Sequence, residues 1–325
     1  MTADRAQQNV VAVIGETLID LVQAGPGGLF EAVPGGSPAN VAVGLARLDV
    51  PTRMVARLGD DLLGEWIREH LMANDVDLSF SVEASEPSSL AIVAIGRDGG
   101  AEYEFRVDGT ADWQWRDDEL EQVLDDDVVA VHSGSLALTI EPGAGAITRL
   151  LDRARAGATV SYDPNCRPLL MGRPEDVLHR VNALLAVADV VKASSEDVAW
   201  LFPGREPEAV AEEWLARGPA FVAVTLGSDG VVAAGRKAGL FRRPGREVRV
   251  VDTVGAGDSF TSAMLAALHR RSLLGATHRD ALRTLGARDL ADVLDEAVLA
   301  SAITCTRRGA EPPVLADLAT AVAAS

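Results

Sequence analysis

Residues 248–260 read Val-Arg-Val-Val-Asp-Thr-Val-Gly-Ala-Gly-Asp-Ser-Phe, and they carry the sharpest local signal in the chain. The pattern predicts an extended run over 248–251, a glycine turn, and a helix whose first turn holds Asp258. Gly255 and Gly257 allow the backbone to come close to a ligand. The free N–H groups of a first helical turn point outward, so the segment predicts an anion site.

Asp258 is the side chain with evident chemistry in this stretch. The helix dipole favours its ionised form, which leaves it available as a proton acceptor. A hydroxyl group held against it becomes a nucleophile, and the neighbouring amides can hold the charge of a transferring phosphoryl group. The alternative is that Asp258 only caps the helix, a frequent role of Asp.

Outward from this stretch, short apolar runs rich in β-branched residues alternate with longer stretches of helical spacing. The runs that resemble buried strands are 10–14, 128–132, 159–163, 190–192 and 221–226. The helical stretches are 40–48, 62–74, 142–156, 175–187 and 207–217. The alternation predicts an α/β fold, a mostly parallel sheet flanked by helices on both faces.

One region breaks the alternation. Two extended runs, 90–95 and 101–107, flank Arg-Asp-Gly-Gly at 97–100, which predicts an antiparallel hairpin. With the extended segment 17–23, it predicts a small β-sheet lid formed by segments about 16–33 and 88–112. Such a lid keeps water from accepting a phosphoryl group. No long linker interrupts residues 1–325, so we expect a single domain.

Composition limits the partners and the compartment. The net charge of -18 disfavours nucleic acid and anionic membranes, and the longest basic cluster, 242–249, is interrupted by Pro244, Gly245 and Glu247. The two cysteines, Cys166 and Cys305, support neither a disulfide framework nor a cysteine-ligated zinc site. The apolar run at 10–14 is too short for a signal peptide or a membrane span, so we expect a cytoplasmic protein.

Three other functional motifs are disfavoured, because the glycine-rich segments lack residues that these motifs need. A dinucleotide fingerprint needs a small residue where Phe260 stands. A Walker loop needs Gly-Lys-Ser/Thr, whereas residues 236–238 read Arg-Lys-Ala. A serine hydrolase elbow at Ser37 is disfavoured because Pro38 lacks the N–H that would line the oxyanion hole.

Two segments carry a family resemblance. Residues 35–42, Gly-Gly-Ser-Pro-Ala-Asn-Val-Ala, and residues 252–258 resemble the N-terminal and C-terminal signatures of the ribokinase-like (PfkB) carbohydrate kinases. Further agreement lies at 15–20, 59–64, 163–167 and 225–230, so the resemblance covers about 10–313. It implies a ribokinase-like fold and an ATP-dependent sugar kinase.

The resemblance also implies residue roles. Asp258 would be the general base, with the backbone amides of Gly255, Ala256 and Gly257 as an anion hole. The substrate-binding residues would be Asp20, Gly36, Asn40, Phe105 and Arg167. From the residues alone, a structural role is as well supported as sugar binding for both residues: Asp20 as a turn residue and Asn40 as a helix cap.

For the nucleotide and metals, the resemblance implies ATP with Mg²⁺. The residues it assigns to the nucleotide are Lys192, Ser194, Thr225, Gly227, Gly230 and Ala302. Asp197 would orient magnesium through water, although many relatives carry Asn-x-x-Glu where this chain has Ser194 to Asp197. Asp252 fits the carboxylate that some relatives use for a monovalent cation such as K⁺.

Within the family the chain looks most like the fructokinases, which phosphorylate fructose to fructose 6-phosphate. A 2-keto-3-deoxygluconate kinase would favour a lid arginine for the sugar carboxylate, but Val107 stands there and Arg106 precedes it. Ribokinase is a further alternative, and 4% aromatic residues disfavour a nucleoside kinase. From another class, a non-catalytic sugar- or nucleotide-binding protein stays open. The resemblance allows a homodimer through the lid.

Overall fold

The computed structural model describes residues 9–24, 28–95 and 101–323, and its largest element is an eight-stranded sheet. Along the sheet the strands are β14 (Gly239–Arg243), β13 (Val231–Gly235), β12 (Phe221–Thr225), β11 (Val190–Ser194), β10 (Thr159–Asp163), β9 (Val128–Gly134), β1 (Val10–Ile14) and β4 (Thr52–Val55). The strands from β12 to β4 are parallel, and β13 and β14 are antiparallel. The predicted mostly parallel sheet is confirmed.

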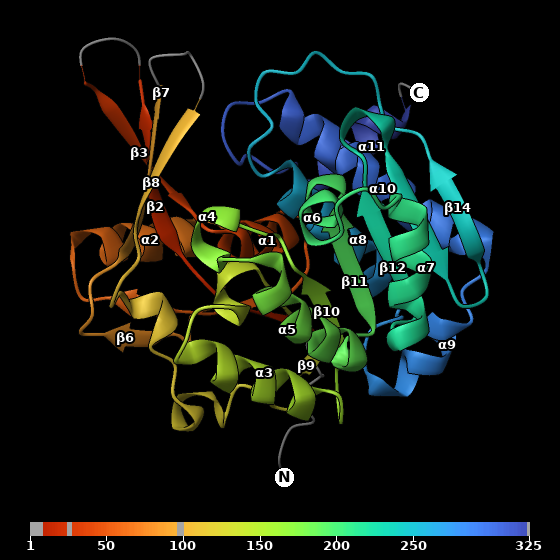
Figure 1. Cartoon of the computed structure of the whole chain (residues 1–325), viewed down its shortest axis with the longest axis horizontal. Coiled ribbons are helices and arrows are strands. Elements are labelled where there is room, and N and C mark those ends of the chain that lie inside the picture. Colours follow the sequence, from red (N-terminus) through yellow and green to blue (C-terminus); the bar gives the residue numbers. More distant parts are fainter. Residues whose placement is uncertain (1–8, 25–27, 96–100, 324–325) are drawn as a thin grey trace.

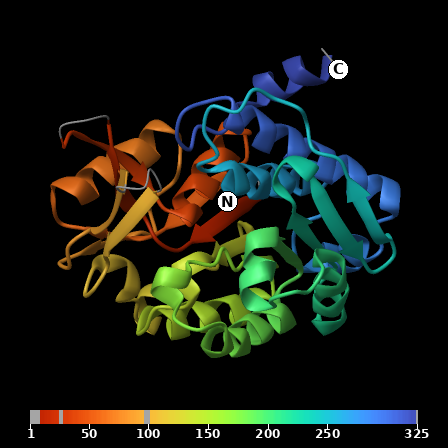
Figure 2. The ribbon, with the colours of Figure 1, turned by 45° about the horizontal axis from the view of Figure 1, so that its top comes forward.

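Helices cover both faces of this sheet (Figure 2). They are α1 (Ser37–Arg47), α2 (Leu62–Ala73), α3 (Gly143–Ala154), α4 (Pro168–Met171), α5 (Pro174–Val187), α6 (Ser195–Leu201), α7 (Pro207–Arg217), α8 (Ala256–Arg270), α9 (Arg279–Arg283), α10 (Ala287–Cys305) and α11 (Leu315–Ala323). None of the helices in the three described ranges is long and apolar enough to cross a membrane.

Alternating side chains of the strands build two separate cores. In β1, Val11 and Val13 join the core that includes residues of α1, α8 and α10, and Ala12 and Ile14 join the core that includes residues of α3, α5 and α7. Successive side chains of a strand point to opposite faces, so a strand covered on both sides must be apolar throughout. This is why the strands were recognisable as continuous apolar runs.

A second, smaller sheet projects from the body beside α1 and α2 (Figure 1). Its strand order is β3 (Phe30–Gly35), β2 (Leu18–Gln23), β7 (Ser89–Ile95) and β8 (Ala101–Arg106). The pairs are antiparallel except for β2 with β7. The predicted small sheet is confirmed, whereas the turn predicted at 97–100 lies outside the described residues. A further two-stranded sheet joins β5 (Arg57–Gly59) to β6 (Val82–Ala84).

The predicted strand at 248–251 was wrong. Residues 244–250 have no regular secondary structure. The N–H groups of Val251 and Asp252 both donate to Cys305 O at the end of α10, at 2.8 and 3.3 Å. The side chains of Val250 and Val251 are 59% and 60% exposed. The segment therefore crosses the surface toward α8, because its backbone binds a helix end instead of a neighbouring strand.

The carboxyl ends of the parallel strands meet at one edge of the main sheet. Asp163 ends β10, Ser194 ends β11 and Thr225 ends β12. In open α/β sheets, ligands bind outside this edge, where the connecting loops diverge. The fold therefore places these polar residues at the position where a ligand site is expected.

Candidate active site

The N-terminus of α8 forms one side of the site. Its cap residue, Gly255, has the left-handed backbone angle φ of 73°. A Cβ at this position would lie 2.6 Å from Ala310 Cβ and 2.8 Å from Ala310 Cα, so both backbone angle and space require glycine. Of the three amides predicted to form an anion hole, that of Ala256 donates to Thr253 O at 3.2 Å. Asp258 lies in the first helical turn, as predicted.

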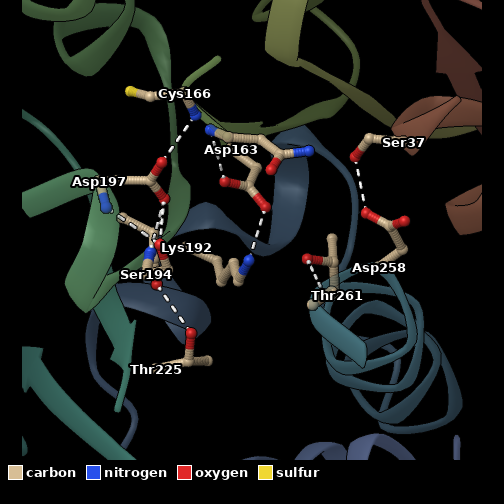
Figure 3. A network of polar contacts seen from close by, with 12 residues as sticks. Ser37, Asp163, Cys166, Lys192, Ser194, Asp197, Thr225, Asp258 and Thr261 are labelled. Carbon is tan, nitrogen blue, oxygen red and sulfur yellow. Dashed lines mark hydrogen bonds and ion pairs between the residues drawn. The ribbon is translucent and has the colours of Figure 1, made fainter. Parts of the chain in front are cut away.

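Two side chains of α1 hold the carboxylate of Asp258, and Figure 3 shows one of them, Ser37. Ser37 Oγ donates to Asp258 Oδ1 at 2.7 Å, and Asn40 Nδ2 donates to Asp258 Oδ2 at 2.8 Å. The residues are more than 200 positions apart in the chain and only partly buried. The structure therefore brings together the two segments that carry the family resemblance.

Close packing of α1 against α8 sets the distance between these groups. Gly44 lies seven residues after Ser37 and faces Ser262, which lies four residues after Asp258. A Cβ on Gly44 would stand 2.7 Å from Ser262 Cβ and 2.3 Å from Ser262 Oγ. Residues three, four and seven apart share a helix face, so the polar contacts and this small-residue contact belong to one interface.

A buried ion pair lies under the first turn of α8. Lys192 Nζ contacts Asp163 Oδ2 at 2.9 Å, and their side chains are 5% and 3% exposed. Lys192 Nζ would also lie 3.0 Å from a Cβ placed on Gly257. Burial lowers the pKa of Lys192, but the carboxylates of Asp163 and Asp197 outweigh it and raise the pKa overall. Burial raises the pKa of Asp163 to about 6, against the opposing effect of Lys192. The pair has no net charge when both groups are ionised, but its cationic end, Lys192 Nζ, is the end that faces the first turn of α8.

Asp197 ties the ends of β10 and β11 together. Its Oδ2 accepts from Ser194 N and Ser194 Oγ, at 2.7 and 2.8 Å, and its Oδ1 accepts from Cys166 N at 2.6 Å. Ser194 Oγ in turn accepts from Asp197 N, which completes a capping box at the start of α6. Cys166 is buried and packs in a core. The Cys166 thiol also bonds to this carboxylate, and Asp197 is only 5% exposed, so the carboxylate is largely satisfied within the protein.

The turn after β12 is held by two glycines. Gly227 and Gly230 have positive φ angles of 59° and 97°. A Cβ on Gly230 would lie 2.1 Å from Arg243 O, so the turn packs against the backbone that follows β14. Thr225 Oγ1 donates to Ala193 O at 3.3 Å. Ala302 lies on α10 and is 8% exposed. Nothing in these contacts distinguishes a nucleotide site from a structural turn, so the assignment stays a prediction.

The small sheet contributes an acidic residue to the same region. Asp20 lies on β2, and burial raises its pKa to about 6. Arg167 opposes this shift and Asp258 adds to it, so the three charged groups lie within electrostatic reach of one another. Arg167 Nη1 also donates to Asn165 Oδ1 at 2.7 Å. The structure thus brings three of the predicted residues to one place.

Phe105, the other lid residue predicted to bind substrate, lies on β8 opposite Ala91 of β7 and is partly buried. Gly36 precedes α1 with a φ of 102°, and a Cβ there would lie 2.6 Å from Glu16 O. Both residues therefore lie in ordered backbone next to the contacts described above. Their roles in binding sugar stay predictions.

Two buried carboxyl groups anchor the base of the small sheet. Asp112 Oδ1 accepts from Thr17 N at 2.7 Å, and Glu16 Oε2 accepts from Ala137 N at 3.2 Å. Burial raises the pKa of Glu16 to about 7 and that of Asp112 to about 6. These groups connect the start of β2 to the body, and each is 2% exposed or less.

Asp252 connects the segment before α8 to the turn after α10. Its Oδ1 accepts from Val254 N at 3.1 Å and its Oδ2 from Gly309 N at 2.9 Å. Each oxygen therefore keeps an acceptor lone pair. The contact joins Asp252, which the resemblance associates with a monovalent cation, to the turn at Gly309.

Sequence reasoning missed two residues of this site. The sequence gives Ser37 no role beyond the family signature at 35–42 and a disfavoured hydrolase elbow, and it gives Asp163 no role beyond the family agreement at 163–167. Asp163 carried a recognisable signal, because a carboxylate that ends a buried strand needs a partner at the sheet edge. The partner of Ser37 had no local signal, since Asp258 follows it by 221 residues.

Together the fold and the site define an α/β protein with a polar ligand site at the carboxyl edge of its parallel sheet. The family model for pfkB family carbohydrate kinases matches residues 8–317. The chain therefore belongs to the pfkB family of carbohydrate kinases. The sequence-based expectations of this family and of an enzyme that acts as a carbohydrate kinase are confirmed.

Known relatives agree with this assignment. The chain is 35% identical to a fructokinase of Rhizobium leguminosarum bv. trifolii over 271 residues, which cover 82% of this chain and 81% of the relative. Its structure is similar to that of a fructokinase from Xylella fastidiosa with bound ATP, with a TM-score of 0.88, 29% identity, and coverage of 97% and 99% of the two chains. A double mutant of the Vibrio cholerae O395 fructokinase, bound to fructose, ADP and potassium, has a TM-score of 0.82, 25% identity, and coverage of 97% and 98%.

Proposed function

We propose that this protein transfers the γ-phosphoryl group of ATP to the 6-hydroxyl of fructose. The observation that carries the proposal is the carboxylate of Asp258, held at a helix N-terminus by Ser37 and Asn40. Similarity to fructokinases, one with bound ATP and one with fructose and ADP, supports the choice of donor and acceptor.

In the proposed reaction, Asp258 accepts the proton of the sugar hydroxyl as its oxygen attacks the γ-phosphorus of ATP. The new oxygen–phosphorus bond forms while the bond to the bridging β,γ-oxygen breaks, and ADP leaves with the electron pair. The amides of Gly255 and Gly257 would stabilise the developing negative charge, and that of Ala256 would join them by exchanging its 3.2 Å bond to Thr253 O for the phosphoryl oxygen. Lys192 adds a buried positive charge beside the same turn, which favours an anion there.

The substrate would be oriented by residues from both sheets. Asp20, Gly36 and Asn40 would bind sugar hydroxyls, and Arg167 and Phe105 would close the site. Asn40 already contacts the proposed base, and Asp20 lies within electrostatic reach of it. A sugar bound by these residues would therefore place a hydroxyl near Asp258.

The nucleotide would bind at the ends of β11 and β12, with Lys192, Ser194, Thr225, Gly227, Gly230 and Ala302. Magnesium would neutralise phosphate charge, and Asp197, next to the end of β11, would orient one of its waters. Asp252 would help to hold a monovalent cation, a role that two partly satisfied oxygens permit.

A neutral ketohexose is favoured over a sugar acid by the charges on the small sheet. The Arg106 guanidinium forms an ion pair with Glu104 on its own strand, and the arginine side chain is 64% exposed. It is therefore already paired and offers no dedicated partner for a substrate carboxylate. A 2-keto-3-deoxygluconate kinase, or a ribokinase, is the alternative to be tested directly.

A substrate panel tests the proposal. ADP release is measured with fructose, glucose, ribose and 2-keto-3-deoxygluconate, with magnesium and with or without potassium. We expect the highest kcat/KM for fructose. A higher kcat/KM for the sugar acid or for ribose would make that sugar the assigned substrate in place of fructose. Tight sugar binding in calorimetry without turnover would indicate a non-catalytic binding protein.

Asp258→Asn tests the general base. The amide oxygen can still accept from Ser37, but its NH₂ group then faces the donor of Asn40, whose amide has to rotate. We expect a folded protein whose kcat falls by about 10²–10⁴-fold, the usual contribution of a general base. If the kcat of the variant is close to that of the unaltered protein, Asp258 is not the general base.

A further inference from the structure

The hydroxyl of Ser37 contacts the proposed base, but the steps of the proposed reaction give it no role. It lies in the first turn of α1 and donates to Asp258 Oδ1 at 2.7 Å (Figure 3). Hydrogen bonds to an ionised partner are shorter and stronger than neutral ones. The other carboxylate oxygen accepts from Asn40 at 2.8 Å. One helical turn therefore supplies a donor to each oxygen of the carboxylate.

The position of Ser37 is fixed by its neighbours on both sides. Gly36 has a φ of 102°, and a Cβ there would meet Glu16 O at 2.6 Å. Pro38 is buried against Gly15, where a Cβ would lie 2.4 Å from Pro38 Cγ. A proline in the first turn also fixes the backbone angle φ. The Ser37 hydroxyl is therefore aimed by rigid backbone.

A purely structural role for Ser37 is the simpler explanation to test. Ser at a helix start often bonds a backbone N–H of its own helix, but α1 has no side-chain cap bond, and its cap residue is Gly36. The Ser37 hydroxyl instead donates across the interface to α8. A hydroxyl group that only stabilised α1 would bond to the backbone of α1 and not to Asp258.

We propose that Ser37 is a positioning residue that fixes the orientation of the Asp258 carboxylate for proton transfer. By holding Oδ1, it directs Oδ2 toward the hydroxyl that Asn40 helps to bind. The inference rests on the proposed function, because it assumes that Asp258 acts as the base. It predicts that Ser37 contributes to the chemical step and contributes little to sugar binding.

The test compares Ser37→Ala with a matched control. Ser79 Oγ also donates to an Asp carboxylate, Asp77 Oδ2 at 3.0 Å, in an exposed loop between α2 and β6. Kinetics are measured with fructose and ATP, together with thermal unfolding. For Ser37→Ala we expect kcat to fall by about 10–100-fold, which corresponds to losing one hydrogen bond to a charged group. The KM for fructose should change by less than about twofold, and Ser79→Ala should leave both constants unchanged.

A second pair of variants separates orientation from folding. Ser37→Thr keeps the hydroxyl and Ser37→Val replaces it by a methyl group of similar size. We expect Ser37→Thr to recover most of the lost kcat and Ser37→Val to behave like Ser37→Ala. This comparison holds even if Ser37→Ala lowers the unfolding temperature, because the two branched variants share the same shape.

The outcomes distinguish this inference from the proposed function. If the unaltered protein shows no sugar-stimulated ADP release, the proposed function fails and this inference fails with it. If that protein is active and Ser37→Ala keeps its kcat, only the inference is overturned. Equal kcat values for Ser37→Thr and Ser37→Val, or an effect on KM alone, also overturn it.

Discussion

Gly44→Ala tests whether the α1–α8 contact sets the geometry of the site. The new Cβ would lie 2.7 Å from Ser262 Cβ. Both atoms are attached directly to backbone, so no side-chain rotation relieves the contact. Carbon atoms pack at about 3.5–4.0 Å, so the helices must separate by about 1 Å.

The same displacement has a predictable effect on the base. If it reaches the first turns, the 2.7 Å bond from Ser37 Oγ to Asp258 Oδ1 lengthens to about 3.7 Å, beyond hydrogen-bond range. A misplacement of about 1 Å costs about 10²-fold in activity. For stability, Ala gains about 1 kcal/mol over Gly in a helix, but overpacking costs about 1–3 kcal/mol. We therefore expect a net destabilisation of no more than about 2 kcal/mol.

The assay measures kcat/KM for fructose and the unfolding temperature. Gly145→Ala in α3 is the matched control, because its nearest contact is the flexible Arg149 side chain at 3.4 Å. The double variant Gly44→Ala with Ser262→Gly removes the opposing Cβ, so both activity and stability should return. A Gly44→Ala protein that is as active as the unaltered protein and more stable would show that the α1–α8 contact does not set the geometry of the site.

Three further predictions concern the helix cap, the buried ion pair and the base of the small sheet. Gly255→Ala should lower stability by about 1–2 kcal/mol through its positive φ alone, and more through the contact with Ala310, with loss of kcat for every sugar. Lys192→Met leaves Asp163 buried without its partner, so we expect about 3–5 kcal/mol of destabilisation in denaturant titrations. Adding Asp163→Asn should recover most of it, and failure to recover would show that the pair does not act as a unit. Because burial raises the pKa of Glu16 from 4.5 to about 7, the folded state binds its proton more tightly than the unfolded state. Its stabilising contribution is complete below pH 4.5 and is lost as the pH rises through 7, a change of about 3 kcal/mol that Glu16→Gln should abolish in unfolding titrations at pH 4–8.

Much of the fold could be predicted because its signals are local. Strands β1 and β10 have the predicted bounds, and helix α7 matches its predicted range of 207–217. A parallel strand covered on both faces has to be apolar along its length, so a continuous apolar run in the sequence indicates a buried strand. Helix ends were less predictable, since α1 begins at Ser37 and not at Asn40.

The strand expected at 248–251 shows where local reasoning fails. Three of its four residues are valine, which favours extended structure. A strand also needs a free neighbouring edge, and the backbone of Val251 binds Cys305 O instead. The choice of partner depends on where α10 ends, which the segment itself does not encode.

The sequence by itself determined the α/β class, the position of Asp258 at a helix start and the membership of the carbohydrate kinase family. Periodicity and short motifs are sufficient for these, because they depend on residues close together in the chain. Only the tertiary structure decided that Ser37 and Asn40 hold Asp258, and that Lys192 lies beneath Gly257. Those contacts join residues 65 to 221 positions apart, and their distances follow from how helices and strands pack.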